Sequence, residues 1–199
     1  MKIIGLTGGS GAGKGEVCKA FLSFGIKSID TDKISREVTG KSECLGELVE
    51  NFSGDILRND GELDRKKLAD IAFSSKENHA NLNKITHKYI LNECNNIILD
   101  MQNSGNNKAV IIDAPMLFES GYYKNCDVII SVIADLDKRI QRIIKRDGIS
   151  LEQIESRIKN QKSDDFFIEN SDYVIYNNSD YADIYIQASK IYDKIFGEN

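Results

Sequence analysis

The stretch GLTGGSGAGKG, residues 5–15, decides the fold of this chain. A short apolar run over residues 2–7 leads into its glycines and predicts a buried strand. Beyond the loop, apolar residues recur at the spacing of one helix face, at Val17, Ala20, Phe21 and Phe24. A Gly-x4-Gly-Lys loop between a strand and a helix indicates a phosphate-binding P-loop. The alternative is a glycine-rich turn without a ligand, and the lysine together with the preceding strand favours the P-loop.

Glycine gives this loop its chemistry, because it adopts backbone conformations that other residues avoid and lets successive amides converge on phosphate oxygens. The helix that begins near Lys14 adds its positive N-terminal end. The Lys14 ammonium can reach the β- and γ-phosphates as they gain charge during transfer. The residues of the loop expected to bind ATP are Gly8, Gly11, Ala12, Gly13, Lys14, Gly15 and Glu16.

One position departs from the common P-loop pattern. Gly15 stands where serine or threonine usually supplies a hydroxyl ligand to Mg²⁺. Mg²⁺ is therefore expected to be held through water, by the nucleotide phosphates and by a carboxylate, and no residue is assigned as a direct metal ligand. The candidate carboxylates, in falling order, are Asp30, Asp32, Asp113 and Glu16.

The rest of the chain predicts strands separated by helices. Four more short apolar runs follow the first, at 26–30, 109–113, 128–133 and 173–176, and helical patterns lie at 42–52, 64–73, 76–103, 135–146, 150–160 and 180–197. Strands that alternate with helices favour a parallel sheet covered on both faces. We therefore expect an α/β, P-loop NTPase-type three-layer fold with a five-stranded parallel sheet, a helical acceptor-binding insertion over about 39–104 and a lid over about 135–165.

Composition narrows the class of protein. A chain of 199 residues fits one domain with a modest insertion, and 41% hydrophobic residues suffice for a core. The net charge of −5 argues against broad attraction to nucleic acid or to anionic membranes. The four cysteines form no CxxC pair, and the N-terminal residues lack an export signal, so we expect a cytoplasmic protein without a zinc site. A monomer or a weak homo-oligomer is expected.

Six segments occur in a specific order: GLTGGSGAGKG at 5–15, GIKSIDTDKISREV at 25–38, GELDRKKL at 61–68, DAPMLFE at 113–119, KRDGIS at 145–150 and DYVIYNN at 172–178. In their order and spacing they resemble the dephospho-CoA kinase family, and the resemblance runs from the first strand to about Asn178. It implies transfer of the ATP γ-phosphoryl group to the ribose 3′-hydroxyl of dephospho-CoA, the last step of coenzyme A synthesis.

The resemblance also implies roles for individual residues. Asp32 matches the second aspartate of a D-x-D segment, where a general base for the acceptor hydroxyl is expected, although it also stands where a helix N-cap would. Arg142 and Arg146, four apart on one helix, match the lid over ATP; Arg142 would stabilise transition-state charge and Arg146 would close over the nucleotide. Taken alone, such a basic run is more often a solvated helix face.

Four further residues follow from the same resemblance. Asp113, at a strand end, would contact the acceptor, although it could equally cap that end. Arg65 and His87 match positions of the insertion near the acceptor, and Lys88 replaces the proline usual after that histidine. Asn177 would approach the adenine, although an ordinary turn accounts for it as well.

Two other functions remain open from the sequence. Another small-molecule kinase, such as a nucleoside monophosphate kinase, is suggested by the sequence GKG and would differ only in its acceptor. A nucleotide-binding protein that has lost turnover is suggested by Gly15 and Glu16. Comparing turnover of dephospho-CoA with that of AMP separates these possibilities.

Overall fold

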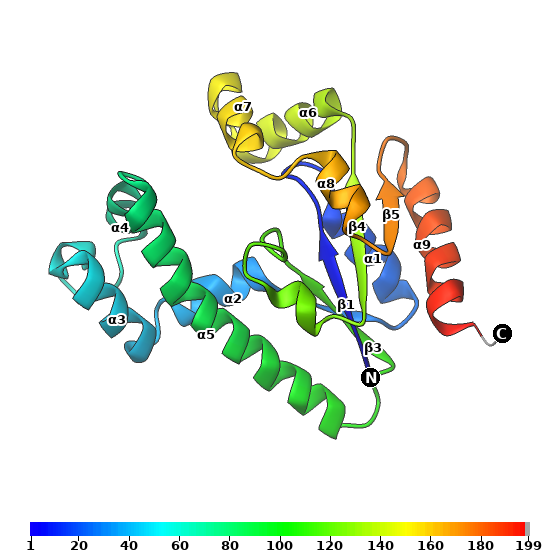
Figure 1. The fold of residues 1–199 in the computed structure, drawn as a ribbon, viewed down its shortest axis with the longest axis horizontal. Helices are drawn as coiled ribbons and strands as arrows, with labels where there is room; N and C mark the ends of the chain where they lie inside the picture. Colours follow the sequence, from blue (N-terminus) through cyan, green and yellow to red (C-terminus); the bar gives the residue numbers. More distant parts are fainter. Residues whose placement is uncertain (198–199) are drawn as a thin grey trace. The chain divides into compact units, whose positions relative to one another are not determined.

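The computed structural model describes residues 1–197, in which five strands form one sheet; Figure 1 shows how the strands and helices are arranged. The strand order is β2-β3-β1-β4-β5. β1 lies at the centre and pairs in parallel with β3 and β4, and β4 pairs in parallel with β5. The bounds of the strands are β1 (Lys2–Thr7), β2 (Lys27–Asp30), β3 (Ala109–Asp113), β4 (Val128–Ile133) and β5 (Tyr173–Tyr176). The predicted five-stranded parallel sheet is confirmed.

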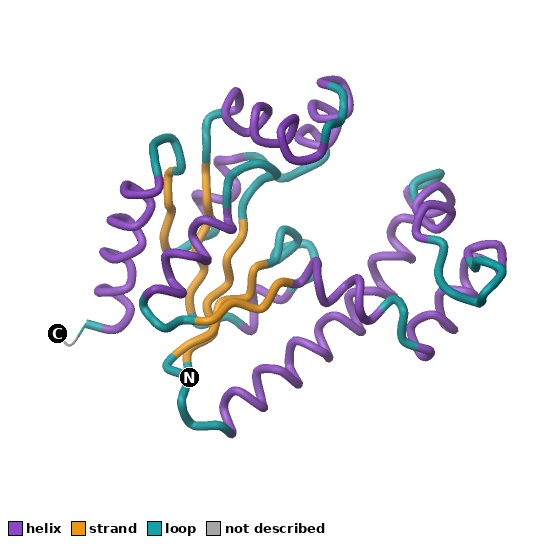
Figure 2. Tube along the Cα trace, turned by 180° about the vertical axis from the view of Figure 1, so that it is seen from behind, coloured by secondary structure: helices purple, strands orange, loops and turns teal. Residues whose placement is uncertain are grey.

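The chain divides into two compact units, and each is described by itself. The first comprises Met1–Ile29 and Asn106–Asn199, of which the final two residues are not described. Besides the strands and a 3₁₀ turn at Tyr122–Asn125, it contains α1 (Lys14–Ser23), α6 (Leu136–Asp147), α7 (Leu151–Lys159), α8 (Asp164–Glu169) and α9 (Tyr181–Phe196). Figure 1 shows α1, α8 and α9 beside the strands, and α6 and α7 beyond the strand ends; Figure 2 shows the same arrangement from behind, with helices in purple and strands in orange.

The strand β3 is buried on both of its faces. Within β3, Ala109 and Ile111 belong to a buried cluster that includes residues of α1 and α9. Val110 and Ile112 alternate with them and are equally buried, so they face the opposite side of the sheet. A strand buried on both faces has to be apolar throughout, which is why the run at 109–112 shows no alternation of polar and apolar residues.

The second unit, Asp30–Gly105, is built mainly from helices. They are α2 (Thr31–Val38), α3 (Ser42–Phe52), α4 (Arg65–Ala72) and the long α5 (Lys76–Asn103), with a 3₁₀ turn at Gly54–Ile56. Its own buried cluster joins α3, α4 and α5 through Cys44, Leu48, Phe52, Leu68, Ala72 and Ile85. The residues expected to form the helical insertion all fall within this unit.

Most element boundaries match the pattern of apolar residues in the sequence. β1, β3, β4 and β5 have the predicted bounds, and β2 begins at Lys27, one residue later than expected. α8 was not predicted, because its six residues DDFFIE are too few to display a helical period. Across residues 1–197, none of the helices combines the length and the apolar character that crossing a membrane requires.

Candidate functional site

The loop between β1 and α1 requires glycine both for its backbone conformation and for its close packing against neighbouring segments. Gly8, Gly11 and Gly13 have φ values of 138°, 78° and 95°, which side chains with a Cβ rarely adopt. A Cβ on Gly8 would also collide with the backbone carbonyl of Val132, and one on Gly11 would lie 2.6 Å from the carbonyl oxygen of Arg139. The loop is therefore shaped by tight packing against β4 and α6.

The first turn of α1 faces the end of this loop. Gly13 caps the helix in the left-handed conformation, and Lys14 is the first helical residue. The first amides of a helix have no partner within it, so those of Lys14 and Gly15 suit an anion. Glu16 adds a carboxylate to the same turn, and its Oε1 lies 2.7 Å from the Lys19 ammonium. That ion pair offsets the negative charge that Glu16 brings to the first turn of α1.

The far side of the loop is held by Arg142 and Asn177. Arg142 Nη1 donates to the carbonyl oxygens of Gly11 and Ala12, at 3.3 Å each. Asn177, which is 3% exposed, donates from Nδ2 to the carbonyl of Ala12 at 2.7 Å. These contacts satisfy the carbonyls of the loop with cationic and amide donors, so two of the predicted site residues are brought directly onto it.

Two residues that the sequence analysis did not select also contact the loop. Arg139 donates to the carbonyl of Ser10, and Gln161 accepts a hydrogen bond from the Ser10 amide. Arg139 lies within a basic run of α6, and Gln161 within a polar connection after α7. Neither position carries a sequence signal, because the contact joins residues that are more than 120 positions apart in the chain.

Asp113 is the last residue of β3 and reaches α1. The Sγ of Cys18 lies 3.7 Å from Asp113 Oδ2 as a hydrogen-bond donor. Burial, followed by the negative charge of Asp113, raises the pKa of the Cys18 thiol to about 12. Cys18 therefore stays a neutral donor to this carboxylate at physiological pH. Because Cys18 is in the second turn of α1, Asp113 lies close to the helix that carries Lys14.

In the second unit, Asp30 and Asp32 have different local roles. Asp30 caps α2, because its Oδ1 accepts hydrogen bonds from the amides of Asp32 and Lys33 at 2.9 and 3.0 Å. Asp32 is exposed in the first turn of the same helix. The helix N-cap considered for Asp32 is thus Asp30 instead, and the carboxylate of Asp32 is left for other chemistry.

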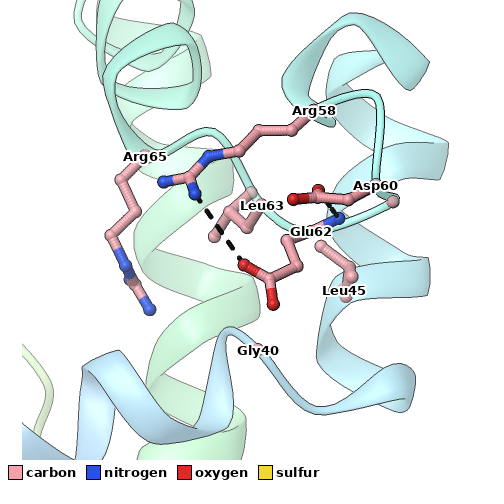
Figure 3. A pocket seen from close by; sticks show the side chains of 8 residues that line it. Gly40, Leu45, Arg58, Asp60, Glu62, Leu63 and Arg65 are labelled. Atoms are coloured by element: carbon pink, nitrogen blue, oxygen red, sulfur yellow. Dashed lines mark hydrogen bonds and ion pairs between the residues drawn. The ribbon is translucent and has the colours of Figure 1, made fainter.

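Arg65 borders a pocket of about 370 Å³ in the second unit (Figure 3). Its guanidinium donates to Thr39 Oγ1 at 2.8 Å and to the carbonyl of Arg36 at 2.5 Å, and so joins α4 to α2. Arg58 and Glu62 line the same pocket, and Arg58 Nη1 lies 3.8 Å from Glu62 Oε2. Asp60 and Glu62 also line this pocket, so its two guanidinium groups are balanced by two carboxylates, and an anionic ligand would have to replace Glu62 as the partner of Arg58.

His87 lies on α5 and is half-buried. Burial lowers the pKa of its imidazole below the ordinary value. Lys88, which replaces the expected proline, continues the helix without a break, and its ammonium lies 2.9 Å from Glu47 Oε2. The substitution therefore gives a helical residue and an α5–α3 ion pair in place of a turn.

Arg146 lies at the C-terminal end of α6 and pairs with Asp147. The Arg146 Nε and Asp147 Oδ1 atoms are 2.6 Å apart, and Arg157 of α7 contacts Asp147 at the same distance. Arg146 and then Arg157 lower the pKa of the Asp147 carboxyl. Unlike Arg142, Arg146 is thus engaged at the surface junction of α6 and α7.

The donor set fits nucleotide phosphates better than it fits a metal held directly by protein. Positions 15 and 16 offer no hydroxyl, and within residues 1–197 no three His, Cys, Asp or Glu side chains gather as a metal site would require. The loop amides, the start of α1 and the Lys14 ammonium are all electropositive groups. The arrangement can hold a polyphosphate, with any divalent ion coordinated mainly by the phosphates and water.

Comparison with known proteins agrees with this chemistry. The family model described as Dephospho-CoA kinase matches residues 2–183. The Dephospho-CoA kinase of Fusobacterium nucleatum is 38% identical over 195 residues, which cover 98% of this chain and 99% of that protein. The solved structure of the dephospho-CoA kinase from Campylobacter jejuni is 29% identical, with a TM-score of 0.71 and 98% of each chain covered. TT1252 from Thermus thermophilus, at 24% identity and a TM-score of 0.84, shares the fold over 99% of this chain and 98% of its own.

Proposed function

The chain belongs to the dephospho-CoA kinase family, and on that premise we propose that it transfers the γ-phosphoryl group of ATP to the ribose 3′-hydroxyl of dephospho-CoA. The observation that carries this proposal is the loop at residues 8–15, whose backbone can bind phosphate, within a chain that matches the family over nearly its whole length. The enzyme is accordingly an ATP-dependent phosphotransferase.

ATP is held by the loop, and catalysis is largely positioning and electrostatics. We assign the amides of Gly11, Gly13, Lys14 and Gly15 to the β-phosphate, while the Ala12 amide donates to the Gly9 carbonyl at 3.1 Å and holds the turn of the loop. The ammonium of Lys14 stabilises charge on the β- and γ-phosphates. The support for this role is that the loop carbonyls are held on the other side, by Arg142 and Asn177. The conformation of the loop is then set before ATP binds, so little ordering remains to be done.

Asp32 orients the acceptor hydroxyl and takes its proton. The hydroxyl oxygen bonds to the γ-phosphorus, the bond from that phosphorus to the β-phosphate oxygen breaks, and ADP leaves. The proton of the hydroxyl passes to the Asp32 carboxylate. This assignment is supported by the cap at Asp30, which leaves the Asp32 carboxylate outside the helix-start hydrogen bonds.

The arginines of α6 act on the nucleotide side. Arg142 brings a positive charge to the loop that carries the phosphates, and we assign it the stabilisation of transition-state charge through that position. Arg146 closes over the nucleotide with the α6–α7 segment and exchanges its contact to Asp147 for one to ATP. Closure excludes water, which would otherwise accept the phosphoryl group. Asn177 is assigned to a contact with the adenine, and it also supports the loop through its hydrogen bond to the Ala12 carbonyl.

The acceptor is assigned to three other residues. Arg65 offers its guanidinium to the diphosphate of dephospho-CoA at the pocket in Figure 3, and Arg58 joins it when the diphosphate replaces Glu62 as the partner of Arg58. His87 contacts the acceptor without transferring a proton, and a lowered pKa suits a neutral imidazole. Asp113 contributes an acceptor contact from the end of β3.

Mg²⁺ neutralises phosphate charge when it accompanies ATP. We propose that water links the ion to the protein, with Asp30, Asp32, Asp113 and Glu16 as the candidate carboxylates. The proposed compartment is the cytoplasm, and the proposed oligomeric state is a monomer or a weak homo-oligomer.

The test is a coupled assay that measures kcat/KM for dephospho-CoA and for AMP at saturating ATP. A preference for dephospho-CoA of at least about 10²-fold is expected, because acceptor contacts that form only with the correct substrate contribute several kcal/mol. A preference for AMP would refute the proposal and favour a nucleoside monophosphate kinase. ATP binding without turnover of either acceptor would refute it in favour of a binding protein.

A further inference from the structure

Both backbone groups of Ser10, at the tip of the phosphate-binding loop, are held by side chains from other elements. The Ser10 amide donates to Gln161 Oε1 at 2.8 Å. The Ser10 carbonyl accepts a hydrogen bond from Arg139 Nε at 2.9 Å. The tip of the loop is therefore tied to α6 and to the connection between α7 and α8.

Arg139 is unusually buried for a charged residue. Its side chain is 6% exposed, and its Nη1 lies 3.2 Å from Asp164 Oδ1. Its Nη2 contacts Gln161 Oε1 at 3.5 Å. A buried guanidinium is tolerated only where its charge and donors are matched. The acceptors that match it are Ser10, Gln161 and Asp164, so its burial depends on the tip of the loop staying where it is.

The glycines of the loop make this approach possible. A Cβ on Gly9 would collide with the guanidinium of Arg139, and a Cβ on Gly11 would press on the Arg139 backbone. Gly9 does not have a positive φ, so its lack of a side chain serves space and not backbone conformation. The contact with Arg139 thus accounts for a glycine that the left-handed conformations do not explain.

We propose that Arg139 is a positioning residue for ATP. It fixes the tip of the loop through Ser10, and it keeps Gln161 aligned on the Ser10 amide. It does not touch the reacting atoms. The proposal rests on the proposed function only in taking residues 8–15 as the phosphate-binding loop.

A positioning role of this kind predicts a specific kinetic pattern. Without Arg139 the free loop samples more conformations, and ATP binding has to order it again. Once ATP is bound, Lys14 and the α1 amides act as before. The KM and Kd for ATP should therefore rise while kcat changes little.

The experiment compares Arg139→Met and Arg139→Lys with Lys145→Met, in which an exposed cation of the same helix is removed. Titration calorimetry gives the Kd of ATP without acceptor, the coupled assay gives KM and kcat, and hydrogen exchange reports on the amides of residues 8–13. Arg139→Met should raise Kd and KM about tenfold or more, the loss expected for a charged hydrogen bond, with kcat within about threefold. The loop amides should exchange about tenfold faster. The Kd, KM and exchange rates of Arg139→Lys should lie between those of the wild type and those of Arg139→Met. The values for Lys145→Met should match the wild type.

Unchanged Kd and exchange in Arg139→Met would overturn the proposal. So would a fall in kcat at constant Kd, which would place Arg139 in the chemical step. If Arg139→Met does not fold, Asp164→Asn replaces it, because this variant weakens the ion pair that holds the same guanidinium. It should raise the Kd of ATP and the exchange rate of the loop amides by a smaller factor. No change in either quantity would also overturn the proposal. Failure of wild type to bind ATP would instead defeat the proposed function.

Discussion

Arg142 Nη2 donates to both oxygens of Asn177, the backbone carbonyl and the side-chain Oδ1, at 3.0 Å each. The residue that follows β5 thus fixes the guanidinium of α6 that supports the loop between β1 and α1. Asn177 is nearly fully buried, so the amide has no water to replace these partners. The pair makes the position of the loop depend on two segments far from it in the chain.

Asn177→Ala should therefore weaken both stability and ATP binding. Loss of the buried amide leaves Arg142 and the carbonyl of Ala12 short of partners, which costs about 1–3 kcal/mol. The KM for ATP should rise about tenfold, since 1.4 kcal/mol corresponds to a factor of ten. Urea unfolding and the coupled assay measure the two effects. Asn170→Ala, which removes an exposed amide bonded within its own helix, is the control, and equal behaviour of both variants would contradict the role of Asn177.

Asp32→Asn should lower kcat about 10²-fold or more while ATP affinity stays near normal, because the substitution removes the proposed proton acceptor and leaves the loop unchanged. The chain offers a close control. Asp64→Asn removes a charge at the N-cap of α4, where asparagine caps a helix as well as aspartate does, so α4 and kcat should both be retained. Steady-state kinetics and ATP titration compare the two variants. An unchanged kcat in Asp32→Asn would remove Asp32 from the chemical step.

Gly15→Ser should be tolerated and should lower the Mg²⁺ concentration needed for ATP binding. A Cβ at this position has no neighbour within 4 Å, and serine is the better helix former by up to about 0.5 kcal/mol. The new hydroxyl would stand where P-loops commonly bind the metal. The measurement is the Kd of ATP across a Mg²⁺ titration. Gly46→Ser, at an equally open helical position in α3, is the control; coincident titrations of wild type and Gly15→Ser would mean that position 15 is remote from the metal.

His87 should make stability depend on pH. Burial lowers its pKa below the ordinary 6.5, so between 6.5 and that lower pKa the unfolded chain binds more protons than the folded one. Stability from this source is complete above about pH 6.5 and declines as the pH falls through this window. Urea unfolding between pH 5 and pH 8 should show the decline in wild type and a flatter profile in His87→Gln. The same slope in His87→Gln as in the control His79→Gln would attribute the decline to other groups.

The sheet and the loop were predictable from sequence because their signals are local. An apolar run such as 109–113 needs no partner to be recognised, and the glycines with Lys14 specify the loop by spacing alone. The cap of α2 was harder to predict, because the sequence suggested Asp32 as a possible cap and the structure has Asp30 there. Aspartate stands at both positions and suits a helix N-cap at either. Only the backbone geometry assigns the cap of α2 to Asp30.

The role of α6 could not be predicted in the same way. Taken alone, the run KRIQR is more often a solvated helix face, and the role of each of its residues depends on which side of the helix packs against the loop. Arg139 is buried and Arg142 is half-buried, whereas Lys145 of the same helix is exposed. That difference comes from tertiary packing against residues more than 120 positions earlier, which no local pattern contains.

The close fit of Gly9 and Gly11 against Arg139 has a consequence for protein engineering. A loop transplanted from another kinase into this scaffold would carry its own side chains into the space of a guanidinium, even if its phosphate contacts were ideal. A chimera should therefore exchange the loop and the first half of α6 together. The two segments form one transferable module, although nearly two thirds of the chain separates them.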